Sequence, residues 1–314
     1  MMLQTHSQSF VIADLHSESG IQFVIIVQMS GGLGNQLFQY ATGKALAVRT
    51  RQPLVIDDRV FHEDKFRSFC LPLFVAEFTL AQNCPDAAVI LPPSRRRWAA
   101  FLLWRWTRGR KLKYLRERSM RFDATVLDSG HHVYLHGYWQ SEEYFRDVAA
   151  VIREELSLRL PPSGENAEWL SEISAGNSVS IHVRRGDYVS DPKAGRVHGT
   201  CSLEYYRRAT EEMTRRTSRE PTFYVFSDDP QWVADHLRLP FPTRYVSHND
   251  DSHNYEDLRL MTACRHHIVA NSSFSWWGAW LGGNPDRIVI APKTWFNDPS
   301  RSDRSLVPAE WVRL

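Results

Sequence analysis

The second half of this 314-residue chain alternates short apolar runs with amphipathic segments from residue 179 to residue 290. The apolar runs predict strands at 179–183, 222–226, 244–246, 267–270 and 287–290. The segments between them predict helices at 202–216, 231–237, 255–265 and 274–281. Strict alternation is typical of a parallel, doubly wound sheet, because each helix carries the chain back to the start of the next strand. The predicted fold class is therefore α/β.

The first half begins with the same kind of unit. A strand at 23–28, a glycine-rich turn, an amphipathic helix and a second strand at 53–57 predict the opening of a βαβ unit. A strand at 133–138 and a helix at 142–156 close this half. Ser141 is a good N-cap for that helix, because its hydroxyl can accept a hydrogen bond from the first turn.

A proline- and glycine-containing stretch, "LPPSG" at 160–164, predicts a linker between the two halves. We therefore expect an unpatterned extension at 1–20, an N-terminal domain at 21–160 and a C-terminal domain at 161–314. The hydrophobic content of 43% is typical of ordinary globular protein, and both domains follow a Rossmann-like pattern.

Residues 95–121 carry many arginines and lysines against a single acid, Glu117, with tryptophans interleaved. Two interpretations are open: a solvated helix with an apolar contact face, or a basic helix that lies on an anionic membrane surface. The longest apolar run near the N-terminus, 23–27, is far shorter than the roughly 20 residues of a membrane span. We therefore expect a cytoplasmic protein, either free or peripherally attached to the inner membrane through residues 95–121.

Charge and metal-ligating residue types exclude several classes of function. The formal net charge is only +2, which argues against a dedicated nucleic-acid-binding protein. The four cysteines lie far apart without zinc-type spacing, so we expect free thiols in a reducing compartment. The histidine pairs at 131–132 and 266–267 are adjacent rather than spaced like metal ligands. No D-x-D triplet occurs, so we expect arginine rather than a metal ion to neutralise a bound phosphate.

Polar side chains follow every predicted strand of the C-terminal domain. In strand order they are Arg184, Arg185 and Asp187; Ser227, Asp228 and Asp229; residues 247–251; Asn271, Ser272, Ser273 and Ser275; and Lys293. The carboxyl ends of parallel strands form one rim, and ligands bind there in open α/β sheets. Helix capping explains some of these residues, but it does not explain paired arginines.

The rim favours a phosphorylated ligand. The guanidinium of Arg184 suits a phosphate, and so do the free N–H groups of a helix that starts after Ser273. Asp228 or Asp229 suits a ribose hydroxyl or a base N–H.

A second glycine-rich loop, "SGGLGNQLFQY" at 30–40, follows the first strand. Gly32 and Gly34 match part of the dinucleotide fingerprint, but Leu37 stands where a third small residue belongs, so nicotinamide binding is a weak interpretation. We instead expect this loop to bring its backbone close to a ligand held between the domains.

Five motifs in this order carry a family resemblance: "GGLGNQLFQYA", "GYWQSEEYF", "HVRRGDYV", "FYVFSDDPQW" and "NSSFSWWGAWL". Together they resemble the bacterial α-1,2-fucosyltransferases, which are glycosyltransferase family 11-like and related to the α-1,6- and protein O-fucosyltransferases. The similarity runs from about residue 23 to residue 296.

The resemblance implies a GT-B-like fold, in which an acceptor-side N-terminal domain faces a GDP-sugar-binding C-terminal domain across a cleft. It implies an inverting, metal-independent enzyme that uses GDP-β-L-fucose as donor substrate and needs no cofactor. The product would carry α-linked fucose on O2 of a terminal galactose, on an oligosaccharide or glycolipid such as an O-antigen precursor.

The resemblance also assigns roles to residues. Arg184 is expected to grip the β-phosphate and to act in catalysis, since a positioned guanidinium stabilises the charge that develops on the leaving group. The remaining expected donor-site residues are His182, Arg185, Asp187, Ser227, Asp228, Asp229, Asn271, Ser272, Ser273, Ser275, Gly32, Gly34 and Gln36. Arg185 has a second interpretation, a structural ion pair with Asp187 or another acid.

The general base for the acceptor hydroxyl is left open. Asn35 is placed in the catalytic set because it can orient a hydroxyl, although an amide is not a normal base. Glu142, Glu143, Asp57 and Asp58 remain candidates. The alternative functions are a fucosyltransferase of another linkage, an enzyme for a different GDP-sugar, a non-catalytic GDP-sugar- or glycan-binding protein, and a Rossmann oxidoreductase.

Overall fold

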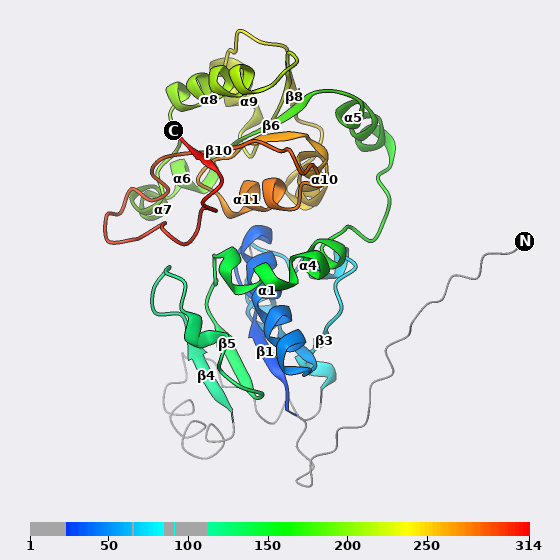
Figure 1. The fold of residues 1–314 in the computed structure, drawn as a ribbon, viewed down its shortest axis with the longest axis vertical. Helices are drawn as coiled ribbons and strands as arrows, with labels where there is room; N and C mark the ends of the chain where they lie inside the picture. The colour runs from blue at the N-terminus through cyan, green and yellow to red at the C-terminus, as the bar shows by residue number, and fades with distance from the viewer. Residues whose placement is uncertain (1–22, 65, 85–90, 92–111) are drawn as a thin grey trace, which may run out of the picture.

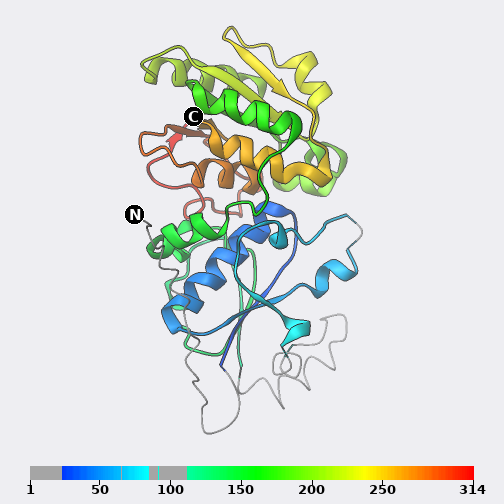
Figure 2. The same cartoon turned by 90° about the vertical axis from the view of Figure 1, so that its right-hand side faces the viewer.

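The computed structural model describes residues 23–64, 66–84, 91 and 112–314, and it consists of two lobes stacked along the long axis (Figures 1 and 2). Each lobe contains one parallel sheet, and the two sheets lie on either side of residue 160 in the sequence. The predicted α/β class is confirmed.

The N-terminal lobe is built on a sheet with the strand order β3-β2-β1-β5-β4. Its strands are β1 Ile25–Gln28, β2 Leu54–Asp57, β3 Thr79–Leu80, β4 Lys113–Arg116 and β5 Val133–His136. The central strand β1 is almost fully apolar and buried, as expected for a strand covered on both faces. Helix α1, Leu33–Thr50, packs against the sheet.

The C-terminal lobe is built on a sheet with the strand order β11-β10-β9-β6-β7-β8. Its strands are β6 Ser178–Val183, β7 Thr222–Ser227, β8 Thr243–Val246, β9 His266–Ile268, β10 Val289–Ala291 and β11 Val312–Arg313. The five strands predicted from alternation are all present, each within a few residues of its expected bounds.

Helices cover both faces of this second sheet (Figure 1). One face carries α5 Gly164–Ala175, α10 Asn254–Ala263 and α11 Ser273–Trp280, and the other carries α8 Leu203–Arg216 and α9 Pro230–His236. Ser202 caps α8 by accepting a hydrogen bond from the Tyr205 N–H at 3.1 Å. Two short helices, α6 Gly186–Ser190 and α7 Pro192–Val197, follow β6 directly.

The single helix predicted at 142–156 is wrong. The chain instead forms two 3₁₀ turns, η5 Glu142–Tyr144 and η6 Arg146–Val148, before helix α4, Ala149–Glu155. Phe145 interrupts the helix with φ −137° and ψ 11°, because its ring is drawn into the core between the lobes. Ser141 does cap the first turn, accepting a hydrogen bond from the Glu143 N–H.

A helix throughout residues 95–121 is also wrong, because Lys113–Arg116 form strand β4 at the edge of the sheet. Tyr114 stacks on Tyr134 of β5 at 5.4 Å, whereas Lys113 and Arg116 are exposed. Charged, exposed residues at both ends of the strand suit an edge position. Residues 92–111 lie outside the described residues, so the membrane-contact hypothesis stays a prediction.

Aromatic rings join the two lobes. Phe38 on α1 lies 4.4 Å from Trp276 and 5.0 Å from Trp277 on α11, measured between ring centroids. Phe145 stacks on Trp277 at 5.5 Å and meets Trp280 edge-on at 5.3 Å. All five rings are buried, and they belong to a hydrophobic core that continues from one lobe into the other. Because this interface is apolar, we expect the lobes to behave as one unit.

Candidate functional site

The carboxyl ends of the two sheets meet where helix α1 faces helix α11 (Figure 1). The Ser273 hydroxyl at the start of α11 donates a hydrogen bond to the Asn35 side-chain oxygen at 3.0 Å. Arg67 of the N-terminal lobe pairs with Asp187 of the C-terminal lobe at 3.5 Å. The structure therefore brings the glycine-rich loop at 30–40 and the rim of the C-terminal sheet together at the junction of the lobes.

Arg184 lies at the end of β6, between two carboxylates. Its guanidinium is 2.5 Å from Asp187 and 2.8 Å from Asp228, and it lies 5.4 Å above the ring of Tyr188. Burial lowers the pKa of Arg184, but the carboxylates of Asp228 and Asp187 raise it by more, so the pKa is above its ordinary value. The side chain is thus held as a fixed cation that retains 21% exposure.

Arg185 turns the other way and forms a structural brace. Its guanidinium pairs with Asp229 at 3.1 Å and lies 3.5 Å above the ring of Trp232. Its backbone N–H donates to Asp228 at 2.8 Å. This arrangement matches the second interpretation of Arg185, with Asp229 rather than Asp187 as the acid. Ser227 tightens the same turn, donating to the Val183 carbonyl and accepting from the Asp229 N–H.

His182 is a buried, neutral imidazole beside this cation. Burial, followed by the charge of Arg184, lowers the pKa of His182 to about 3. Its ring lies 5.5 Å from that of Phe274, and within the described part of the chain its Nδ1 atom has no hydrogen-bond partner. Buried polar atoms are normally paired, so this enclosed and unpaired nitrogen is an exception among the described residues.

Three of the predicted serine and asparagine positions hold the backbone rather than face open space. Asn271 donates to the carbonyls of His198, Gly199 and Trp295, all from its buried amide nitrogen. Ser272 caps α11 by accepting from the Phe274 N–H, and Ser275 donates to carbonyls one turn back. These side chains shape the rim, and a direct donor contact for them stays a prediction.

The glycine-rich loop approaches protein rather than an open cleft. A Cβ atom at Gly34 would lie 2.5 Å from the Ser273 carbonyl carbon and 2.6 Å from the Phe274 nitrogen, so only glycine fits. The first turn of α11, where free N–H groups were expected, therefore packs directly against α1. Gly32 is open, with Arg67 the nearest side chain at 3.7 Å.

The two amides of this loop have different surroundings. Gln36 is fully buried, donating to the carbonyls of Gly31 and Ser68 and accepting from the Cys70 N–H. It fixes the loop from within. Asn35 accepts from Gln140 at 2.7 Å as well as from Ser273, so its side-chain oxygen is already used at the junction.

The model of glycosyl transferase family 11 matches residues 10–314. The chain belongs to glycosyl transferase family 11. This family 11 glycosyltransferase is 31% identical over 308 residues to alpha-1,2-colitosyltransferase of Escherichia coli, covering 93% of this chain and 99% of that protein. It is 25% identical over 300 residues to galactoside alpha-(1,2)-fucosyltransferase 1 of Homo sapiens, covering 92% of this chain and 74% of that protein. The resemblance predicted from the five motifs is confirmed.

A solved structure of a mutant of Arabidopsis thaliana FUT1 in complex with GDP has a similar fold. The TM-score is 0.50 at 13% identity, covering 93% of the family 11 glycosyltransferase and 76% of that chain. The predicted GT-B-like architecture, with two α/β lobes facing each other, is confirmed.

Most candidate bases of this family 11 glycosyltransferase are engaged elsewhere. Asp57 is buried and bound by Arg59 and by the Tyr134 hydroxyl. Glu142 accepts a hydrogen bond from the Trp280 indole N–H at 3.0 Å, and this bond joins the two lobes. Arg146 pairs with both Glu142 and Glu143. Asp58 is buried beside His62 at 3.5 Å. These ion pairs and hydrogen bonds argue for structural roles and leave the base unassigned.

Sequence reasoning missed two residues of the site, Tyr188 and His198. Their rings stack at 4.7 Å with an interplanar angle of 4°, and Tyr188 lies beneath the Arg184 guanidinium. They lie on and just after helices α6 and α7, which are too short to produce a periodic pattern. The family 11 glycosyltransferase has no group of three His, Cys, Asp or Glu side chains placed to hold a metal ion among its described residues.

Proposed function

We propose that this family 11 glycosyltransferase transfers L-fucose from GDP-β-L-fucose to O2 of a terminal galactose, with inversion at the anomeric carbon. The observation that carries the proposal is the family match over nearly the whole chain, together with a fixed arginine at the rim. The α-1,2 linkage is supported by the names of both relatives, one of which acts on galactosides and is named a fucosyltransferase.

The geometry suggests how Arg184 would act. Asp187 is 40% exposed and is shared with Arg67, so an incoming diphosphate can displace it and take its place at the guanidinium. Asp228 is more buried and holds the arginine in position from the other side. As the glycosidic bond to the donor breaks, charge develops on the β-phosphate, and the guanidinium stabilises that charge more than it stabilises the ground state.

Neutral His182 suits the same ligand. Because the pKa of His182 is about 3, the imidazole stays uncharged at neutral pH and adds no repulsion to Arg184. The ring lies beside Phe274 at the start of α11, so we propose that His182 supports this part of the donor site from beneath.

A second candidate donor is a GDP-linked colitose, because a relative at 31% identity is named a colitosyltransferase. Colitose is L-fucose without its 3-hydroxyl group, so the two donors differ by one polar contact. A site that hydrogen-bonds this hydroxyl would reject colitose by about 10⁴-fold, whereas a site that leaves it in solvent would accept both.

The deciding experiment supplies GDP-fucose or GDP-colitose with a panel of galactosides and reads the product linkage by NMR. We expect an α-1,2-linked fucosyl product, formed equally well with a chelator present. An Arg184→Ala protein that is folded but inactive is the control for a site-dependent reaction. A product at another hydroxyl, a strong preference for colitose, or no transfer from either donor would each contradict the proposal.

Membrane association is tested separately, by co-sedimentation of the full chain with anionic vesicles. Among the described residues, no helix combines the length and the apolar character that crossing a bilayer requires. We propose a peripheral contact through residues 95–121, which carry the basic and aromatic side chains. Absence from the vesicle pellet at low salt would contradict this contact.

A further inference from the structure

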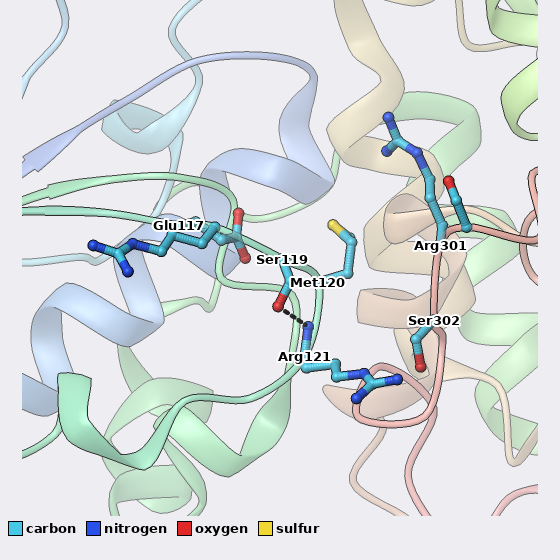
Figure 3. Close-up of a pocket in the computed structure, with 8 residues that line it drawn as sticks. Glu117, Ser119, Met120, Arg121, Arg301 and Ser302 are labelled. Carbon is cyan, nitrogen blue, oxygen red and sulfur yellow. Dashed lines mark hydrogen bonds between the residues drawn. The ribbon is translucent and has the colours of Figure 1, made fainter.

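A cavity of about 580 Å³ lies between the lobes, beside the candidate site. Two segments line it: residues 117–121, which follow strand β4 of the N-terminal lobe, and residues 300–302 of the C-terminal lobe (Figure 3). Its volume is within the range of about 300–1,000 Å³ that is usual for small-molecule sites. None of the donor-site residues predicted from the sequence lines it.

The cavity carries an excess of positive charge. Arg118, Arg121 and Arg301 line it, against a single carboxylate, Glu117. Within the described part of the chain, Arg118 and Arg121 form no ion pair, and Arg301 has only a distant partner in Asp298, at 3.8 Å. In Figure 3 the side chain of Arg121 extends from its own loop toward the opposite segment, whereas the side chain of Arg301 turns away from Arg121, so the two guanidinium groups present separate positive charges.

Glu117 does not neutralise these arginines. Its two carboxylate oxygens accept hydrogen bonds from the backbone N–H groups of Tyr138, at 2.7 Å, and Trp139, at 3.0 Å. Burial raises the pKa of Glu117, and the two N–H donors lower it by less. The carboxylate therefore ties the end of β4 to the end of β5, and the guanidinium groups remain available to an anion.

Aromatic rings connect the cavity to the candidate donor site. The guanidinium of Arg184 lies over Tyr188, Tyr188 stacks on His198, and His198 lies 5.6 Å from Phe296. Arg301 lies over the other end of this series, 5.9 Å from the Phe296 ring. The cavity is thus next to the site of transfer but separated from Arg184 by three rings.

The N-terminal lobe borders the cavity on its other side. Trp139, which binds Glu117, is followed by Gln140, and the Gln140 amide binds Asn35 at 2.7 Å. A molecule in this cavity would therefore lie between the acceptor-side loop and the rim of the donor-side sheet, where an acceptor has to lie for transfer.

We propose that this cavity binds an acidic stretch of the acceptor glycan, whose carboxylate or phosphate pairs with Arg121 on one wall or with Arg301 on the opposite wall. Guanidinium groups bind both anions in a bidentate manner, and Ser119 and Ser302 offer hydroxyls to neighbouring sugar hydroxyls. The inference rests on the proposed function, because it makes the substrate an acidic galactose-containing glycan.

The test measures binding of matched glycans to the full chain by calorimetry, without donor. Three ligands share one galactose terminus: a neutral oligosaccharide, the same oligosaccharide with a uronic acid, and the same oligosaccharide with a phosphate. We expect the wild-type chain to bind at least one acidic ligand about tenfold more tightly than the neutral ligand, and the difference to shrink as salt is raised. The acidic ligand that binds more tightly shows whether the anionic group is a carboxylate or a phosphate.

The variant Arg121→Ser/Arg301→Ser should lose this preference and bind the neutral ligand as before. Arg207→Ser/Arg208→Ser is the matched control, since it removes two exposed arginines from the outer helix α8, and it should keep the preference. Equal wild-type affinity for all three ligands, or a double variant that keeps the preference, would overturn the inference. A double variant that loses affinity for GDP instead would also overturn it, because the cavity would then belong to the donor.

Failure of the proposed function gives a different result. If the chain binds acidic glycans more tightly but transfers no sugar from any GDP-sugar, the anion-binding site is supported and the proposed transfer is contradicted. If transfer to neutral galactosides is efficient and acidic glycans bind no more tightly than neutral ones, the proposed transfer is supported and the anion-binding site is contradicted.

Discussion

Replacing Gly34 with alanine tests whether helix α1 sets the spacing of the two lobes. A Cβ atom at this position lies 2.5 Å from the carbonyl carbon of Ser273 and 2.6 Å from the amide nitrogen of Phe274. Carbon contacts need about 3.5 Å, and both neighbours are backbone atoms, so no side-chain rotation relieves the overlap. We expect helices α1 and α11 to separate by about 1 Å.

This separation has two measurable consequences. Overpacking of a buried contact lowers the free energy of unfolding by about 1–3 kcal/mol, which corresponds to a melting temperature roughly 2–10 °C lower. A displacement of about 1 Å also lowers the rate of transfer about 100-fold, because groups on opposite lobes no longer reach the reacting geometry. The rate effect requires that donor and acceptor are held by different lobes.

Thermal unfolding and steady-state transfer are measured on the same preparations. Gly283→Ala is the matched control, because no atom lies within 4 Å of a Cβ atom at Gly283, and it should behave as wild type. A Gly34→Ala protein with unchanged stability would refute the steric reasoning. A variant that is destabilised but retains its turnover when folded would refute the link between lobe spacing and catalysis.

Three further predictions concern single side chains. Arg184→Ala should lower kcat about 100- to 1,000-fold, since one donor to the leaving group is lost, while circular dichroism stays native; a near-normal kcat would contradict the assignment. Arg185→Ala should lower the free energy of unfolding by about 1–2 kcal/mol through loss of its ring stack and ion pair, with kcat changed far less; the opposite order of effects would assign Arg185 to the ligand. Burial, followed by nearby positive charge, lowers the pKa of His267 from 6.5 to about 3. Below pH 6.5 the unfolded chain therefore binds a proton at His267 that the folded chain does not bind. The free energy of unfolding consequently falls on acidification. Denaturant titrations at pH 7 and pH 5 should therefore show a drop that is smaller in His267→Gln by about 2 kcal/mol, and identical drops would contradict the burial argument.

The sequence predicted the C-terminal sheet well because its strands are continuous apolar runs separated by amphipathic helices. Strands β3 and β11 have only two residues each, and α6 and α7 complete fewer than two turns, so none of them produces a periodic signal. The predicted helix at 142–156 failed because Phe145 packs across the lobes, and this long-range contact overrides local helix propensity.

The candidate site was predictable in type but not in detail. Polar residues after each strand indicated the rim, and the pair of arginines marked its charge. The different surroundings of the two arginines depend on Asp229 and Trp232, which contact the Arg185 guanidinium and not that of Arg184. The cavity between the lobes depends on residues 117–121 and 300–302, which are far apart in the sequence and form no motif.

The aromatic interface has a consequence for how this family can diversify. Phe38 and Phe145 from one lobe pack against Trp276 and Trp280 from the other, and the buried Glu142 carboxylate accepts a hydrogen bond from the Trp280 N–H. A chimaera that joins lobes from two relatives would mismatch these rings and remove one of the two donors to the buried Glu142 carboxylate, leaving only Arg146. Exchange of single loops around the rim would leave this interface intact, whereas exchange of a whole lobe would not.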